Sequence, residues 1–383
     1  MTLAAASSID LASARALFPV TERYTWLNHA AHSPLSTRVA GVMTAYAAEH
    51  RDTGLLDFHA WIDKIDGARR DAATLLNASP ADVAFVKNTS TGLLLVANGL
   101  DWRAGDNVVT AEREFPSNVH PWLNLKARGV ETRFAPCRDG RVLIDDIAAL
   151  MDDRTRVLAV SYVGFSTGYR HDLAALADLA HARGAYLVVD GVQGLGAMPL
   201  DVAATGVDFL SAAGHKWLMA SYGAGVFYVK PGLLDVLSTQ WTSWLSHDGA
   251  ETDMDRYDQP LWNDARRFEE GVFNLVGILG LGASIATLLE YGVPNIQRHV
   301  FALNDALMEE LQTCGYQVVS PHASEAERSG IVIFRHPTIA PVDIEARLKA
   351  ANVIVSVRGG GLRVAPHFYS SWDDMQRLLD ALP

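Results

Sequence analysis

The clearest pattern along the chain is a set of short apolar runs without polar alternation, each followed by a polar or glycine-bearing turn. They lie at residues 157–163, 186–189, 207–210 and 225–230. Such runs are typical of strands that are covered on both faces in a parallel sheet. Residues 36–77 instead place apolar and polar positions at helical spacing. The pattern predicts an α/β fold built on a central, mostly parallel sheet.

Two unequal domains are expected from the length of the chain and from its later pattern. A chain of 383 residues exceeds what one compact domain usually holds. The apolar runs fall within residues 21–284, which we assign to a large domain. Residues 285–383 alternate helical stretches with short strands, and we expect them to form a smaller α/β domain together with residues 1–20.

An acid and a lysine follow two of the apolar runs. Asp190 ends the run at 186–189, and Lys216 stands in a glycine-bearing turn after the run at 207–210. Ligands of open α/β sheets bind at the carboxyl ends of the strands, so we expect the two side chains to meet there. A lysine amine can form a Schiff base with an aldehyde cofactor, and a carboxylate can keep a pyridine nitrogen protonated. A buried ion pair without chemistry is the alternative.

The segments VVDGVQ and DFLSAAGHKW around these two residues resemble the class V aminotransferase and cysteine desulfurase family of fold-type I pyridoxal 5'-phosphate enzymes. The resemblance covers roughly residues 24–370. It implies that Lys216 forms the Schiff base and that Asp190 binds the pyridine nitrogen. It also implies that Gln193 lies beside the ring hydroxyl and His215 near the phosphate.

The phosphate site is expected where a short strand and a hydroxyl-rich turn lead into an apolar helix, at residues 83–100. Helix N-termini attract anions, although serine and threonine are also ordinary helix caps. By its place in the family pattern, this turn makes Ser90 and Thr91 phosphate contacts. Two hydroxyls that relatives carry are missing, because Ala213 replaces a serine and Val272 replaces a threonine that reaches the partner's cofactor in a dimer.

Three further residues are expected at the site by the same resemblance. Phe115 stands where desulfurases have a histidine, and a phenyl ring can stack on the pyridine but cannot transfer protons; a plain core position is the alternative. Arg363 is expected to bind the substrate α-carboxylate through its planar guanidinium, with Arg358 as a weaker second candidate and a surface salt bridge as the alternative. His29 lies in a turn-rich segment and is a candidate substrate contact.

The chain lacks the catalytic cysteine that desulfurases carry between these two arginines. Only glycines and a leucine lie between Arg358 and Arg363, and the two cysteines of the chain are Cys137 and Cys314. We therefore expect no persulfide transfer through a protein thiol. This feature places the expected activity nearer the isopenicillin N epimerase-like and C–S lyase-like branch of the family.

The composition of the chain limits the kinds of partner that the protein is expected to bind. A net charge of −12 argues against nucleic acid or anionic membranes as partners, and no metal-ligand spacing occurs. Two cysteines are too few for a disulfide framework, and no long apolar span or signal peptide is evident, so a cytoplasmic protein is expected. The resemblance further implies a homodimer with the active site at its interface and a small amino acid as substrate.

The reaction that these residues predict is removal of a Cβ substituent, of the C–S type, from an α-amino acid. Amino transfer is the close alternative, because both reactions begin with the loss of the α-proton. An epimerase would need a second base on the face where Phe115 offers none. A catalytically inactive pyridoxal-phosphate-binding protein is disfavoured by the retention of Lys216, Asp190 and Arg363.

Overall fold

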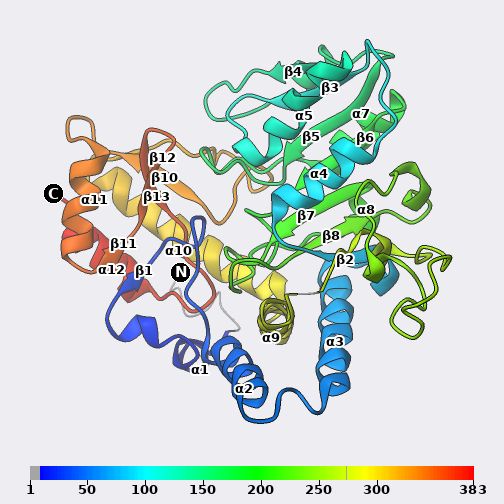
Figure 1. Ribbon diagram of the computed structural model, residues 1–383. Coiled ribbons are helices and arrows are strands. Elements are labelled where there is room, and N and C mark those ends of the chain that lie inside the picture. Colours follow the sequence, from blue (N-terminus) through cyan, green and yellow to red (C-terminus); the bar gives the residue numbers. More distant parts are fainter. Residues whose placement is uncertain (1–8, 273) are drawn as a thin grey trace.

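The computed structural model describes residues 9–272 and 274–383, and its centre is a seven-stranded sheet with the strand order β2-β8-β7-β6-β5-β3-β4 (Figure 1). Strand β8 runs antiparallel to both of its neighbours, and the other pairs are parallel. The predicted α/β fold with a mostly parallel sheet is thus confirmed. The strands are β2 (Val83–Val86), β3 (Asn107–Ala111), β4 (Glu131–Ala135), β5 (Thr155–Ser161), β6 (Tyr186–Asp190), β7 (Phe209–Ala213) and β8 (Gly225–Val229).

Helices cover both faces of this sheet, which explains why its strands are apolar throughout. Alternate residues of β5 separate into two cores: Leu158 and Val160 pack on one face, Val157 and Ala159 on the other. The first face is covered by the helices α3 (Phe58–Leu76), α7 (Leu173–Ala182) and α9 (Leu275–Tyr291), and the second by α4 (Thr89–Gly99) and α5 (His120–Asn124).

The smaller domain has its own core and a four-stranded antiparallel sheet in the order β12-β13-β10-β9. A two-stranded parallel sheet joins β1 near the N-terminus to β11. Leu27, directly after β1, lies in the core of this domain. The elements are β1 (Thr25–Trp26), β9 (Gln317–Val318), β10 (Val332–Arg335), β11 (Val353–Ile354), β12 (Ser356–Arg358), β13 (Gly361–Val364), α10 (Val293–Thr313), α11 (Pro341–Ala350) and α12 (Trp372–Ala381).

Both expected domain limits fall inside helical segments, and the limit after residue 20 lies within the short 3-10 helix Pro19–Glu22. The expected limit after residue 284 falls inside α9, which packs along α2 (Thr37–Thr53) and α3; the chain turns by 76° between α9 and α10 at Gly292. Because β1 pairs with β11, the small domain also includes residues beyond 20. A short helix, α1 (Leu11–Ala16), precedes β1, and residues 1–8 lie outside the described part of the chain.

The helical pattern at residues 36–77 forms two helices, α2 and α3, because Gly54 ends the first in a left-handed conformation (φ 67°). The short helices α6 (Ile144–Ala148) and α8 (Val202–Thr205) complete the fold. Within residues 9–272 and 274–383, no single helix is long and apolar enough to cross a membrane. Only α9 and α10 taken together, across the bend between them, have that length and composition.

Candidate active site

Most of the predicted site residues line one cavity of about 300 Å³ at the carboxyl ends of β6 and β7. The sequence alone predicted this convergence for Asp190 and Lys216. Seven predicted residues face the cavity: Ser90, Phe115, Asp190, Gln193, His215, Lys216 and Arg363. It is also lined by Asn88, Thr89, Ser117, Phe165 and Arg358, whereas Thr91 and His29 are not among its lining residues.

Asp190 is the last residue of β6 and is only 1% exposed. Its Oδ1 accepts a hydrogen bond from the Val192 amide at 3.0 Å, and no described residue donates to its Oδ2. Burial raises the pKa of the Asp190 carboxyl to about 6, against the opposing effects of the Val192 hydrogen bond and the charge of Lys216. One oxygen of a buried carboxylate is thus left for a ring N–H.

Lys216 lies in the turn after β7, and 9% of its surface is exposed. Burial lowers the pKa of the amine to about 8; Asp190 works against this shift, and Arg363 and Arg358 add to it. A substantial fraction of the amine is therefore neutral near pH 8. Only the neutral amine is a nucleophile, so the environment prepares Lys216 for attack on an aldehyde.

Gln193 and His215 flank this lysine. Both polar groups of the Gln193 side chain form hydrogen bonds within the protein. Its Nε2 donates to the Ala30 carbonyl at 2.9 Å, and its Oε1 accepts from Trp217 Nε1 at 2.9 Å. The His215 ring stacks on Tyr222 with a centroid distance of 4.5 Å. Burial, followed by the charge of Lys216, lowers the pKa of His215 to about 4, so the ring is neutral at pH 7.

Phe115 forms an aromatic wall above the lysine and is 37% exposed, which rules out the plain core position. The Lys216 Nζ atom lies 5.1 Å from its ring centroid. A second ring, Phe165, meets it edge to face at 5.2 Å. Phe165 was not predicted as a site residue, because the sequence around the apolar run at 157–163 does not distinguish it from a residue of the hydrophobic core. The two rings give one side of the cavity no proton-transfer group.

The N-terminus of α4 forms the opposite, polar part of the cavity. Asn88 caps the helix, with its Oδ1 accepting from the Thr91 amide at 3.0 Å. Thr89 and Ser90 face the cavity; Ser90 Oγ donates to Ser117 Oγ at 2.8 Å. Free N–H groups and hydroxyls at a helix N-terminus make a phosphate site of the predicted kind.

Thr91 is placed differently from the prediction. It is the third residue of α4 and lines a separate cavity together with Glu270 and Val272. Each helical residue turns by about 100°, so a side chain two positions further along points away from the first. Thr89 takes the expected position instead, and its Oγ1 also accepts from the Ala213 amide at 3.0 Å. Identifying Asn88 as the N-cap of α4 would have predicted that Thr89, and not Thr91, faces the cavity.

His29 is a structural residue in this protein and not a cavity residue. It is fully buried; its Nδ1 donates to the Ala365 carbonyl and its Nε2 accepts from the Tyr369 hydroxyl, both at 2.8 Å. Burial lowers the pKa of the ring to about 4. The expected substrate contact is therefore contradicted, although the next residues, Ala30 and Ala31, do line the cavity.

Arg363 enters the cavity from β13 of the small domain and is 2% exposed. Its Nη1 donates to the Phe165 carbonyl at 2.9 Å and its Nε to Ser356 Oγ at 3.3 Å. It makes no ion pair with any described residue, so the surface salt-bridge alternative is wrong. Burial and the nearby charge of Arg358 lower the pKa of Arg363 to about 10, and the group stays charged at neutral pH.

Glu114, beside Phe115, was missed by the sequence analysis. Its Oε1 accepts from the Ser161 amide at 2.6 Å, and its Oε2 accepts from the Ser161 hydroxyl. Ser161 pairs in register with Asp190 on the neighbouring strand. Burial, opposed by these hydrogen bonds, raises the pKa of Glu114 to about 7, and the charge of Asp190 contributes to the rise.

These groups fit pyridoxal 5'-phosphate. Asp190 Oδ2 is free for the pyridine N–H, Lys216 supplies an amine, and Phe115 supplies a ring that can stack on the cofactor. The start of α4 with Ser90 suits the phosphate, although Ala213 contributes no hydroxyl. At the other side, Arg363 offers a paired donor for a carboxylate.

Comparisons with known proteins agree with this geometry. The family described as Aminotransferase class-V matches residues 25–377. A cysteine desulfurase of Klebsiella pneumoniae (strain 342) is 34% identical over 364 residues, 90% of this chain and 87% of that protein. The structure of a cysteine desulfurase from Thermococcus onnurineus NA1 superimposes with a TM-score of 0.88 at 25% identity, covering 98% of both chains. A cystine C–S lyase in complex with its product cysteine persulfide gives 0.86 at 21% identity, covering 95% and 98%.

Proposed function

This chain belongs to the aminotransferase class-V family of pyridoxal 5'-phosphate-dependent enzymes, and from that premise we propose that it is a lyase that removes a Cβ substituent, of the C–S type, from an α-amino acid. The Lys216 amine beside Asp190 carries the proposal, because it is a nucleophile and a base in one position. The relatives described as cysteine desulfurases break the same type of bond and support this choice.

Each residue has a definite task in this proposal. The bound cofactor withdraws electrons from the α-carbon of the substrate. Lys216 binds the cofactor through its amine and, once released, accepts the α-proton at Nζ. Asp190 holds the proton of the ring nitrogen. Arg363 binds and orients the α-carboxylate, and Phe115 stacks on the ring and excludes water from that side.

The sulfur-bearing group leaves without passing through a protein thiol. The turn between β12 and β13 contains only Gly359 and Gly360. Neither Cys137 nor Cys314 lines the cavity, and burial raises the pKa of the Cys137 thiol, which lowers its thiolate fraction. This feature separates the proposed reaction from that of a desulfurase that forms a persulfide on its own cysteine.

Amino transfer is the second candidate, because Lys216 is the amine in the cavity that can move a proton between the substrate and the cofactor. It needs no further base. Epimerisation requires a base on the opposite face, where Phe115 and Phe165 stand. A catalytically inactive cofactor-binding protein would have no need for an amine with a lowered pKa.

We also propose that the protein is a cytoplasmic homodimer. Both cysteines are free in the structure, in keeping with a reducing compartment. Val272 stands where relatives carry a threonine that reaches the partner's cofactor, and its side chain is exposed. The next residue, 273, lies outside the described part of the chain.

The test is the visible absorbance of the reconstituted enzyme while single amino acids are added without a keto acid. For a lyase, the absorbance of the lysine-bound cofactor returns after each addition, with release of ammonia and a sulfur-containing product. A single stoichiometric conversion to pyridoxamine phosphate would instead establish an aminotransferase. Lys216→Ala is expected to lose the cofactor absorbance and at least about 10³-fold in rate, whereas Lys126→Ala, at an exposed position, keeps both.

A further inference from the structure

The cavity holds a second arginine whose position is set by the register of the β12–β13 hairpin. Ser356 pairs with Arg363, and Arg358 pairs with Gly361. Directly opposed residues of an antiparallel pair share one face, and so do residues two positions apart on one strand. Arg358 and Arg363 therefore lie on the same face of the hairpin, as diagonal neighbours.

Arg358 is not neutralised by the protein. Its Nη1 donates to the adjacent Val357 carbonyl at 2.8 Å, and it forms no ion pair with any residue in the described ranges. The carboxylate of Glu345, on α11, accepts a hydrogen bond from the neighbouring Val357 amide at 3.3 Å and forms no ion pair with Arg358. An arginine that lines a cavity without a carboxylate partner is available for an anion of the ligand.

The cavity lining contains two arginines, and an ordinary α-amino acid offers one carboxylate for them. Its lining includes the cations Lys216, Arg358 and Arg363 and the carboxylate of Asp190. Lys216 and Asp190 are committed to the cofactor in the proposed function. Arg363 takes the α-carboxylate, and its burial and fixed contacts suit that constant group. Arg358 remains, on the solvent side of the same face, where a substrate side chain would extend.

We propose that Arg358 binds a second anionic group on the substrate side chain, so that the preferred substrate is an S-substituted α-amino acid whose departing sulfur group carries an anion such as a carboxylate or phosphate. The inference rests on the proposed function, since it uses Arg363 for the α-carboxylate. It names the substrate class of the same site. At the tip of the hairpin, Gly360 has nothing within 4 Å of where a Cβ would stand, whereas Gly359 packs against the Ser166 carbonyl.

The first experiment measures binding without turnover. Succinate and its monoamide, succinamate, have the same shape and differ in one charge, and their dissociation constants follow from the change in cofactor absorbance of the holoenzyme. Wild type is expected to bind succinate about 10-fold to 100-fold more tightly. Arg358→Gln should remove that preference and leave succinamate within about twofold, and Arg358→Lys should retain part of it. Arg363→Gln should weaken both ligands.

The second experiment compares S-carboxymethyl-L-cysteine with S-carbamoylmethyl-L-cysteine, an acid and amide pair with the same Cβ–S bond. Arg358→Gln should lower kcat/KM for the acid alone. Arg128→Gln, in an exposed turn away from the cavity, is the control for the loss of one charge and should change neither substrate. Circular dichroism and the cofactor dissociation constant establish that each variant is folded and loaded.

Three results would overturn the inference. Wild type could bind succinate and succinamate equally, or Arg358→Gln could weaken both alike. Alternatively, Arg358→Gln could raise the dissociation constant of the cofactor itself, which would assign this arginine to the cofactor phosphate. Succinate binding needs no reaction, so a failure of the lyase proposal leaves this result unchanged, and the two failures are distinguishable.

Discussion

At the scale of single residues, two buried carboxyl groups lie on neighbouring elements, and one of them, Asp190, lines the cavity. Asp190 ends β6, and Glu114 reaches Ser161 at the end of β5, directly opposite Asp190 in the sheet. Burial raises the pKa of both, to about 6 and about 7, and each negative charge opposes the other. A ring N–H bound at Asp190 favours the ionised form of that carboxyl group. The negative charge on Asp190 in turn favours the neutral, protonated form of Glu114.

Glu114 should make the apoprotein less stable as the pH rises. Its folded-state pKa of about 7 lies above the ordinary value of 4.5, so its contribution to stability is full below pH 4.5 and is lost as the pH rises through 7. Between about pH 5.5 and about pH 8, this change amounts to about 2 kcal/mol in the free energy of unfolding. Glu114→Gln should remove it from urea denaturation curves, whereas Glu310→Gln, at an exposed position on α10, should not. An unchanged pH dependence in Glu114→Gln would contradict the assignment.

At the scale of elements, the cofactor site depends on how closely α4 approaches the sheet. Gly92 allows that approach: a Cβ at this position would lie 2.3 Å from Ser211 Oγ and 2.9 Å from the Phe227 ring. Both neighbours belong to strands, β7 and β8, that cannot move freely. The N-terminus of α4, with Thr89 and Ser90, is positioned through this contact.

Gly92→Ala should therefore push α4 away from the sheet. We expect a loss of about 1–3 kcal/mol in the free energy of unfolding and weaker cofactor binding, because the clash exceeds the gain in helix propensity. Gly41→Ala is the matched control, because Gly41 is exposed in α2 and nothing lies within 4 Å of the added Cβ. This substitution should raise the free energy of unfolding by about 0.5–1 kcal/mol. Equal effects of both changes in urea denaturation would show that packing of α4 does not matter.

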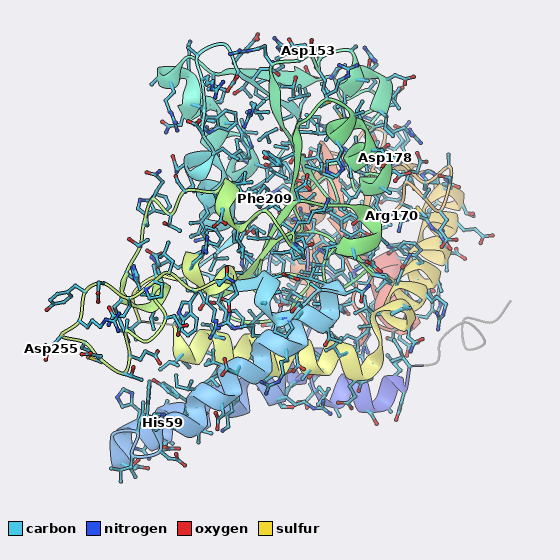
Figure 2. All side chains as sticks on the ribbon, turned by 90° about the vertical axis from the view of Figure 1, so that its right-hand side faces the viewer. His59, Asp153, Arg170, Asp178, Phe209 and Asp255 are labelled. Carbon is cyan, nitrogen blue, oxygen red and sulfur yellow. The ribbon has the colours of Figure 1, made fainter. Side chains whose placement is uncertain are left out.

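At the scale of the whole molecule, one loop stands out from the body of the protein. Figure 2 shows Asp255 at its outer end, beyond the sheet that carries Phe209. The loop exposes aromatic and apolar side chains, including Trp244, Met254 and Tyr257, of which Tyr257 is 91% exposed. They line a cavity of about 510 Å³. Exposed clusters of this composition are typical of association surfaces.

We expect the proposed homodimer to form through this loop. Sedimentation equilibrium should give twice the mass of one chain, and Tyr257→Asp should shift the equilibrium toward the monomer by at least about 10-fold in the dissociation constant, because a charge is then buried in the interface. Val342→Asp, which places the same charge on the exposed start of α11, should leave the mass unchanged. A wild-type monomer would contradict the proposal.

Which features could be predicted from the sequence depends on how far apart in the chain the interacting residues lie. Apolar runs predicted the buried parallel strands, because burial on both faces acts on every residue of a strand. The residues directly after those strands, Asp190 and Lys216, were predicted at the site because strand ends share an edge. The continuation of α9 across residue 284 was not predicted, since α9 is apolar throughout and its packing partners α2 and α3 are distant in sequence.

The sequence by itself thus determined the α/β class, the family and the acid–lysine pair, because these depend on local pattern and on residues next to strand ends. Tertiary structure decided which neighbours of those residues face the cavity. Thr89 faces it and Thr91 does not, since the cap at Asn88 sets the rotation of α4. His29 is committed to Ala365 and Tyr369, and Arg358 is brought beside Lys216, through contacts between segments far apart in the chain. Such long-range packing has no counterpart in local sequence.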